Sequence, residues 1–430
     1  MKSFVKIFGL LCLCGCLAIG SANEKLKTFD WPQWRGPARD GVSLETGLWP
    51  NWKDNTPELV WTGKGLGKGF ASVSIADGKI FTTGNLETAQ TVSAYNQETG
   101  EQLWSVPVTD GAPKHGYDGS RCTPTVDSDR LYVVSSDGQI QSLSVATGEV
   151  YWKKNFEQEW QGRMMSGWGF SESPLVDGDR VICTPGGPNA MIVALDKMTG
   201  DTIWESAVPR VGDKGGDGAG YASIIISEGA GVKQYVTLIG RGVIGVRADD
   251  GKFLWGYNPV ANGTANIPTP IASGDYVFAS SGYGTGAGLV KLSAEGDGVK
   301  AEEVYFLAGN DLQNHHGGML MIGEYLYFGH GHNNGLPVCV DLKSGKKVWG
   351  GDIRGAGSGS AAVTAADGKV VFRYQSGEVA LVKASPEGYD LLGTFTPEVA
   401  QSPCWAGPVV SGGKLYLRDQ DVLMCYRIAP

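Results

Sequence analysis

The sequence predicts an all-β protein, an eight-bladed β-propeller made of four-stranded antiparallel blades. Three observations predict this fold class: a glycine-rich composition, a motif that returns about every 50 residues, and tight-turn dipeptides within each repeat. Glycine supplies 65 of the 430 residues, about twice its usual share. Long helices tolerate glycine badly, so the composition disfavours a helical bundle. Hydrophobic residues make up 42% of the chain, which argues against disorder.

The recurring motif is Thr-Gly followed by three residues and Trp. Clear copies occupy Thr99–Trp104, Thr147–Trp152 and Thr199–Trp204, and weaker copies end at Trp255 and Trp349. The first four copies end 48 to 52 residues apart, a spacing that suits one four-stranded propeller blade. A single blade cannot bury both of its faces, so the repeated indole is expected to pack between neighbouring blades.

Each repeat also contains the pattern of a hairpin. Asp77-Gly78 precedes the apolar pair Ile80-Phe81, and Asp177-Gly178 precedes Val181-Ile182. Such dipeptides supply the positive φ that tight hairpin turns require. First strands of this kind occur eight times, near Val73, Val126, Val176, Ile224, Ile271, Leu320, Val363 and Val409.

The two ends of the chain are predicted to close the ring. The last repeat stops after its third strand, whereas Pro57–Trp61 has the pattern of a fourth strand with no blade before it. We therefore expect residues 57–430 to form one closed propeller, since closure removes exposed sheet edges. Residues 23–56 are expected to be an N-terminal extension packed on the propeller, because Trp31 and Trp34 need cover.

Residues 1–22 have the features of a signal peptide: two early lysines, an apolar stretch too short to span a bilayer, and small residues at the end. Two processing sites stay open, an ordinary cleavage after Ala22 and a lipobox that would make Cys16 a lipid anchor. Either one predicts an extracytoplasmic protein. No later apolar run is long enough to predict a transmembrane segment. The net charge of −9, without any basic run, excludes nucleic acid as a partner.

In a propeller, the loops that lead into each first strand share one face with the loops between second and third strands. All five histidines fall in such loops, so we expect this face to bind a ligand or a protein. The candidate ligand-binding residues lie at or just before first strands of different blades and could converge on one volume. They are Arg121, Trp168, Glu172, Asn266, His315 and His316.

Each candidate has a structural alternative. Arg121 suits an anionic ligand but could equally form an ion pair with Glu172. Trp168 could stack on a flat ligand or simply cap the surface. His330 and His332 could join His315 or His316 around a metal, but no carboxylate lies nearby in sequence. Hydrogen-bonded lining of the channel mouth is therefore favoured, and no metal ligands are assigned.

The Thr-Gly-x-x-x-Trp signature resembles the PQQ-like (pyrroloquinoline-quinone-type) propeller repeat, which quinoprotein alcohol dehydrogenases share with the outer-membrane assembly lipoprotein BamB. Trp31–Pro37 and Arg39–Ser43 are similar to the opening of a group of secreted PQQ-like proteins from planctomycetes and their relatives. The resemblance covers about residues 30–430 and is specific for the fold rather than for a function.

This resemblance implies two functions. BamB-like members are non-catalytic scaffolds, which implies a ligand- or protein-binding module. Enzyme members hold PQQ over calcium with a Glu, an Asn and an Asp base, often against a disulfide between adjacent cysteines. This sequence has no Cys-Cys pair, although Glu172 and Asn266 lie in suitable loops. We expect a binding scaffold; the alternative is a PQQ-dependent alcohol or sugar dehydrogenase with PQQ and calcium as cofactors.

Overall fold

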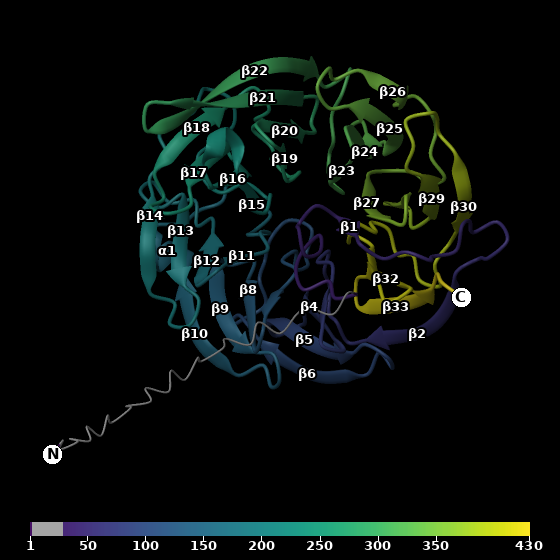
Figure 1. Ribbon diagram of the computed structural model, residues 1–430. Helices are drawn as coiled ribbons and strands as arrows, with labels where there is room; N and C mark the ends of the chain where they lie inside the picture. The colour runs from purple at the N-terminus through teal and green to yellow at the C-terminus, as the bar shows by residue number, and fades with distance from the viewer. Residues whose placement is uncertain (2–28) are drawn as a thin grey trace.

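The computed structural model describes Met1 and residues 29–430, which form a closed ring of eight sheets (Figure 1). Three predicted features lie outside the described residues: the signal peptide beyond Met1, the candidate lipid anchor Cys16 and the first part of the extension. The predicted boundaries after residues 22 and 56 stay predictions. Among the described residues, no helix is long and apolar enough to cross a membrane.

Blades one to four each contain four strands that pair in chain order. The connections are short, so each strand lies antiparallel to its neighbour along the chain. Their strands are β3 (Ser74–Ala76), β4 (Lys79–Asn85), β5 (Gln90–Asn96) and β6 (Gln102–Pro107); β7 (Thr125–Asp127), β8 (Arg130–Val134), β9 (Gln139–Ser144) and β10 (Val150–Asn155); β11 (Leu175–Asp177), β12 (Arg180–Cys183), β13 (Ile192–Asp196) and β14 (Thr202–Ser206); and β15 (Ile225–Ser227), β16 (Gln234–Ile239), β17 (Gly242–Arg247) and β18 (Phe253–Tyr257).

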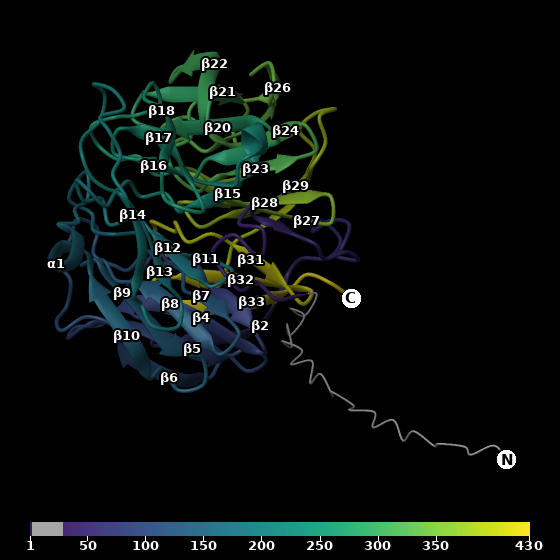
Figure 2. The ribbon, with the colours of Figure 1, turned by 60° about the vertical axis from the view of Figure 1, so that its left-hand side comes forward.

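Blades five to eight continue the ring. Two short helices, α1 (Phe156–Trp160) and η1 (Gly229–Gly231), lie between strands, and α1 sits at the rim in both views (Figures 1 and 2). The strands are β19 (Ile271–Ser273), β20 (Tyr276–Ser281), β21 (Gly286–Glu295) and β22 (Gly298–Ala308); β23 (Met319–Ile322), β24 (Tyr325–His330), β25 (Leu336–Asp341) and β26 (Lys347–Gly350); β27 (Ala361–Ala366), β28 (Lys369–Tyr374), β29 (Val379–Lys383) and β30 (Leu391–Phe395); and β31 (Val409–Ser411), β32 (Lys414–Asp419) and β33 (Val422–Arg427).

The N-terminal residues complete two of these sheets. Strand β2 (Glu58–Lys64) pairs antiparallel with β33, with Trp61 opposite Cys425, and becomes the fourth strand of blade eight. The predicted closure of the ring is therefore confirmed, although β2 runs on to Lys64. A two-residue strand, β1 (Val42–Ser43), adds to the innermost strand β27 of blade seven in parallel, with Val42 opposite Ala365.

The recurring motif joins one blade to the next. The indole of Trp152 lies against Gly200 of the following blade so closely that a Cβ added to this glycine would come within 2.7 Å of the ring. The same indole donates its N–H to the carbonyl oxygen of Lys197 at 3.1 Å. Gly200 has a φ of +77°, so the turn needs glycine for its conformation as well as for its missing side chain. The motif therefore pairs a Trp with the glycine of the next blade.

Three other junctions between blades repeat this packing, through Trp61 on Gly100, Trp104 on Gly148 and Trp204 on Gly251. Trp104 packs on Gly148 and donates to Val145 in the same manner. The indole N–H of Trp255 donates instead to Gln234, because the following blade carries a long β21–β22 hairpin in place of the Thr-Gly turn. At the ring closure, the buried indole N–H of Trp61 has no hydrogen-bond partner among the described residues.

A pair of glycine substitutions separates the two reasons for glycine in the turn, its positive φ and its missing side chain. Gly178, in the β11–β12 turn, has a φ of +61° but no atoms within 4 Å of its would-be Cβ. Gly178→Ala should lower the free energy of unfolding by about 1–2 kcal/mol, the cost of left-handed backbone. Gly200→Ala should lower it by about 1–3 kcal/mol more, because it also overpacks Trp152. Urea unfolding of both variants measures the difference; equal losses would show that the indole does not hold the blades together.

Candidate functional site

A cavity of about 500 Å³ lies at the centre of the ring, and every blade contributes to its wall. The predicted convergence of two loop classes is visible here. Tyr283, His332 and Gln375 come from loops between second and third strands. Each blade also supplies residues from its first strand or from the loop leading into it. Taking one residue from each blade, in order from blade one to blade eight, these are Phe70, Arg121, Trp168, Tyr221, Ile267, His316, Val363 and Trp405.

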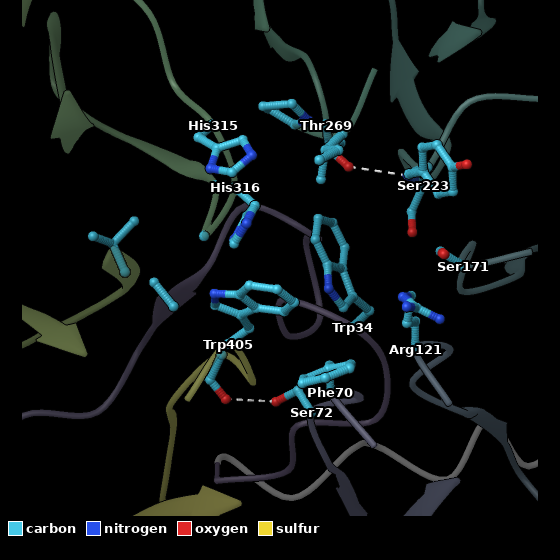
Figure 3. Close-up of a pocket in the computed structure, with 18 of the residues that line it drawn as sticks. Trp34, Phe70, Ser72, Arg121, Ser171, Ser223, Thr269, His315, His316 and Trp405 are labelled. Carbon is cyan, nitrogen blue, oxygen red and sulfur yellow. Dashed lines mark hydrogen bonds between the residues drawn. The ribbon is translucent and has the colours of Figure 1, made fainter. Parts of the chain in front are cut away.

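Four of the six predicted ligand-binding residues line this cavity: Arg121, Trp168, His315 and His316. In the close-up, Arg121 lies on one side of the cavity and the two histidines on the other (Figure 3). The structure does not bring Glu172 or Asn266 to the cavity. Both side chains are buried and turn toward the backbone of their own surroundings.

The carboxylate of Glu172 accepts hydrogen bonds from the backbone N–H of Thr184 at 2.6 Å and from the Thr184 hydroxyl at 3.0 Å. Burial raises the pKa of Glu172 to about 8, partly opposed by these hydrogen bonds and by the charge of Arg39. The nearby guanidinium is thus that of Arg39, and the alternative of an Arg121–Glu172 ion pair is wrong. Glu172 holds the start of blade three together.

The amide of Asn266 is also fully used within the fold. Its side-chain N–H₂ donates to the carbonyl oxygens of Ile239 and Gly240 at 2.9 and 3.0 Å. Its side-chain oxygen accepts from the backbone N–H of Asn262 at 3.0 Å. Asn266 therefore fixes the loop into blade five against blade four.

The guanidinium of Arg121 organises the cavity wall. It donates to the carbonyl oxygens of Gly116, Tyr117 and Gly119, and across to Trp168 in the next loop at 2.9 Å. Its carbon lies 5.5 Å from the centre of the Phe70 ring. Burial lowers the pKa of Arg121 to about 10, so the group is still charged at neutral pH. Arg121 thus supplies a fixed positive charge, with most of its donors already satisfied.

Aromatic rings form much of the wall. The indole of Trp405 has its centre 4.9 Å from the Phe70 ring, 5.2 Å from Tyr117 and 4.6 Å from His316. Across the cavity, Trp168 packs edge-on against Tyr221 at 5.9 Å. These contacts fix flat apolar surfaces that still border the empty volume.

Three histidines gather at one end of the wall. The ring of His315 lies 4.0 Å from that of His316 and 4.1 Å from that of His332, centre to centre. Burial lowers the pKa of His315 to about 3 and lowers the pKa values of the other two, so all three are neutral at pH 7. His315 shares a hydrogen bond between its Nδ1 and the Ser360 hydroxyl at 3.0 Å, while its Nε2 has no partner among the described residues although the side chain is only 9% exposed.

The other two histidines serve the fold. His330 shares a hydrogen bond between Nδ1 and the backbone of Gln313, and His115 pairs with Asp137 at 2.9 Å. Across the described part of the chain, no group of three His, Cys, Asp or Glu side chains is arranged to hold a metal ion.

Sequence reasoning missed several residues of the cavity. Trp34 and Arg35 come from the N-terminal extension, Phe70 and Tyr221 from loops leading into first strands, and Tyr283 from a loop between second and third strands. An aromatic side chain in a loop leading into a first strand was the available signal for Phe70 and Tyr221. No signal in the sequence placed the extension inside the ring.

The charge of the lining is one-sided. Arg35 and Arg121 border the cavity, while no Asp, Glu or Lys among residues 29–430 does. Burial lowers the pKa of Arg35 to about 10, and its guanidinium donates to the carbonyl oxygens of Asp40 and Met319. Neither arginine forms an ion pair with any described residue. The lining therefore carries two positive charges and no carboxylate of the described residues, while Asp40 and Asp118, outside the lining, partly offset the charges of Arg35 and Arg121.

Comparison with known proteins gives one family. A family model described as "Outer membrane protein assembly factor BamB" matches residues 52–167 and 88–351. BamB of Shewanella oneidensis is 23% identical over 267 residues, 58% of this chain and 60% of that protein. BamB of Marinobacter adhaerens is 38% identical over 69 residues, 16% of each chain. The chain spans between 16% and 60% of the length of the curated relatives that it matches.

Solved structures share the fold. BamB from Moraxella catarrhalis superposes with a TM-score of 0.58 at 14% identity, over 86% of this chain and 98% of that one. A europium-containing methanol dehydrogenase gives 0.63 at 13% identity, over 91% and 89%. Quinohemoprotein alcohol dehydrogenase from Comamonas testosteroni gives 0.63 at 13% identity, over 93% and 80%. These identities show a common fold and no more.

The raised pKa of Glu172 predicts a pH dependence of stability. From its ordinary value of 4.5 up to about 8, the folded state keeps the proton while the unfolded state releases it. Stability is therefore lost as pH rises through this range, by at most about 1.4 kcal/mol per pH unit. In Glu172→Gln, the free energy of unfolding should fall less between about pH 5 and about pH 8 than in the parent.

Urea unfolding at the two pH values measures this change. The exposed Glu149 offers the matched control, and Glu149→Gln should follow the parent. Because all three proteins keep the same histidines, their titration cancels from the comparison. A parent and a Glu172→Gln variant with the same pH dependence would contradict the prediction.

Proposed function

This chain belongs to the family of outer membrane protein assembly factor BamB, and from that premise we propose that it is a non-catalytic module that binds a planar organic anion. The binding site is the cavity at the centre of the ring. The observation that carries the proposal is the lining, in which the described residues supply two guanidinium groups and aromatic walls but no carboxylate.

The charge of the ligand follows from the lining. Arg35 and Arg121 sit partly buried, where water screens their charge less than at an open surface. Four N–H groups of Arg121 and two of Arg35 already donate to carbonyl oxygens, so Arg121 in particular acts mainly through a fixed positive potential. Free hydrogen-bonding atoms remain on the uncharged walls, including the unpaired Nε2 of His315. A ligand with negatively charged acceptors complements both features.

The shape of the ligand follows from the walls. Trp168 and Trp405 present flat apolar surfaces, and such surfaces bind flat apolar groups through stacking and burial. A volume of about 500 Å³ falls within the range of small-molecule sites. A concave site of this kind favours a small molecule over a protein loop. Of the two predicted partners, a small-molecule ligand and a protein, we therefore propose the small molecule.

The residues present do not fit a quinone held by calcium. Calcium takes six to eight oxygen ligands, with carboxylates prominent among them. No carboxylate in the described part of the chain borders the cavity, and the two candidates for such a site, Glu172 and Asn266, are hydrogen-bonded to Thr184 and to backbone carbonyls. The alternative of a PQQ-dependent alcohol or sugar dehydrogenase therefore lacks the ligand set that its enzyme relatives use.

We further propose that the module works outside the cytoplasm. The proposal is supported by the signal-like residues 1–22 and by relatives named for outer membrane protein assembly. A lipid at Cys16 would attach it to a membrane surface, whereas cleavage after Ala22 would release it. Mass spectrometry of the mature N-terminus distinguishes the two.

A planar dianion tests the proposed ligand class. The linear naphthalene dicarboxylate should bind the purified protein, measured by titration calorimetry, and its neutral dimethanol analogue should bind at least about tenfold more weakly, a loss of about 1.4 kcal/mol. His316→Ala should weaken binding of the dianion by about tenfold. His316 borders the cavity and forms no hydrogen bond with the described residues, so its ring nitrogens are free to contact the ligand. His115→Ala is the control, since His115 lies outside the cavity lining.

Two results would overturn the proposal. Equal binding of the dianion and the neutral analogue would remove the charge argument. Reconstitution with PQQ and calcium, followed by dye reduction with alcohols or sugars at enzyme-like rates, would show an oxidoreductase instead of a binding module.

A further inference from the structure

We propose that residues 31–45, here called the strap, form a wall of the binding site, and that the indole of Trp34 is the surface on which the planar ligand stacks. This inference rests on the proposed function, because it names the residue that recognises the flat part of the ligand. Neither the blade repeat nor the family match, which begins at residue 52, includes the strap.

The strap crosses the central channel. It begins on blade one, where Trp31 exchanges backbone hydrogen bonds with Ile75 at 2.8 Å in both directions. It reaches blade three through Arg39, whose guanidinium donates to the carbonyl oxygens of Ser173 and Pro174. It ends on blades seven and eight, through β1 and through Glu45, which accepts from the backbone N–H groups of Gly412 and Gly413. Figure 1 shows this purple segment within the opening of the ring.

Blades three and seven are opposite in a ring of eight, so the strap spans the full width of the channel. Arg35 adds a contact to blade six through the carbonyl oxygen of Met319. The strap borders the cavity through Trp31, Trp34 and Arg35. Because it obstructs the channel there, the loop face is the natural route for a ligand.

Two arginines of the strap hold the Trp34 indole in place. The guanidinium carbon of Arg35 lies 5.3 Å from the ring centre and that of Arg39 lies 5.9 Å from it. Both arginines are themselves fixed by carbonyl oxygens of the ring of blades. Trp34 is therefore oriented before a ligand arrives, which reduces the entropy lost on binding.

Trp34 forms few contacts that would stabilise the fold. Its side chain is only half-buried, and it forms no hydrogen bond and no aromatic ring contact with the described residues. Its neighbour Trp31, by contrast, is 2% exposed and packs against Gly36. In Figure 3 the Trp34 ring lies between Arg121 on one side and His316 and Trp405 on the other. A large apolar ring that is partly exposed and borders a cavity is a surface for a ligand.

Substitutions at Trp34 test the proposal with the naphthalene dicarboxylate as the probe. Trp34→Ala should raise the dissociation constant at least about tenfold, and Trp34→Leu should do nearly the same, because it restores apolar bulk without a flat ring. Trp34→Phe should stay within about threefold of the parent. The melting temperatures should stay close to that of the parent, since the indole forms no hydrogen bond.

Trp49 provides the matched control, because it is a half-buried tryptophan of the same extension that does not border the cavity. Trp49→Ala should bind the probe as the parent does. Parent-like binding by Trp34→Ala, or an equal loss in Trp49→Ala, would overturn the role of Trp34 and leave the proposed function standing. A parent protein that does not bind the probe would overturn both proposals. Trp34→Leu decides the question if Trp34→Ala does not fold.

Discussion

The ring is organised by one recurring contact, the indole of one blade lying on the glycine of the next, which four of the eight junctions between blades share. Trp152 packs on Gly200 at a distance that excludes any side chain there, and the indole N–H bonds to the same turn through Lys197. A four-stranded blade exposes two apolar faces, and this contact covers part of one of them while setting the distance to the neighbour. Repeated at four of the eight junctions, it sets the spacing of these blades, and therefore where the loops leading into their first strands lie.

That constraint explains how much of the fold could be predicted from the sequence. A glycine and a tryptophan with a fixed separation recur in five of the eight blades, so their spacing revealed the repeat, and the unmatched strand at residues 57–61 revealed the closure. Blade five lacks the recurring Thr-Gly turn, because a long hairpin replaces the turn on which Trp255 would otherwise pack. The repeat predicts architecture well because it is an interface requirement.

The site could be predicted only in part, for a physical reason. The positions of Arg121, Trp168, His315 and His316 in loops leading into first strands were enough to bring them to the centre of the ring. Glu172 occupies the same class of position, yet Thr184 offers it two hydrogen bonds inside the sheet, and the sequence does not show which way a polar side chain turns. Trp34 and Arg35 depend on the path of the strap, which is set by contacts with residues far away in the chain, such as Met319.

The ring closure has a consequence for the order in which the protein matures. Strand β2 lies near the beginning of the chain, and its partner β33 lies at the very end. During synthesis, early blades can form as their residues emerge, but β2 must wait without its partner until the last strand is made. Blade eight also carries Trp405, so the cavity itself is incomplete until that moment. A chain that stops short therefore yields early blades without the complete cavity.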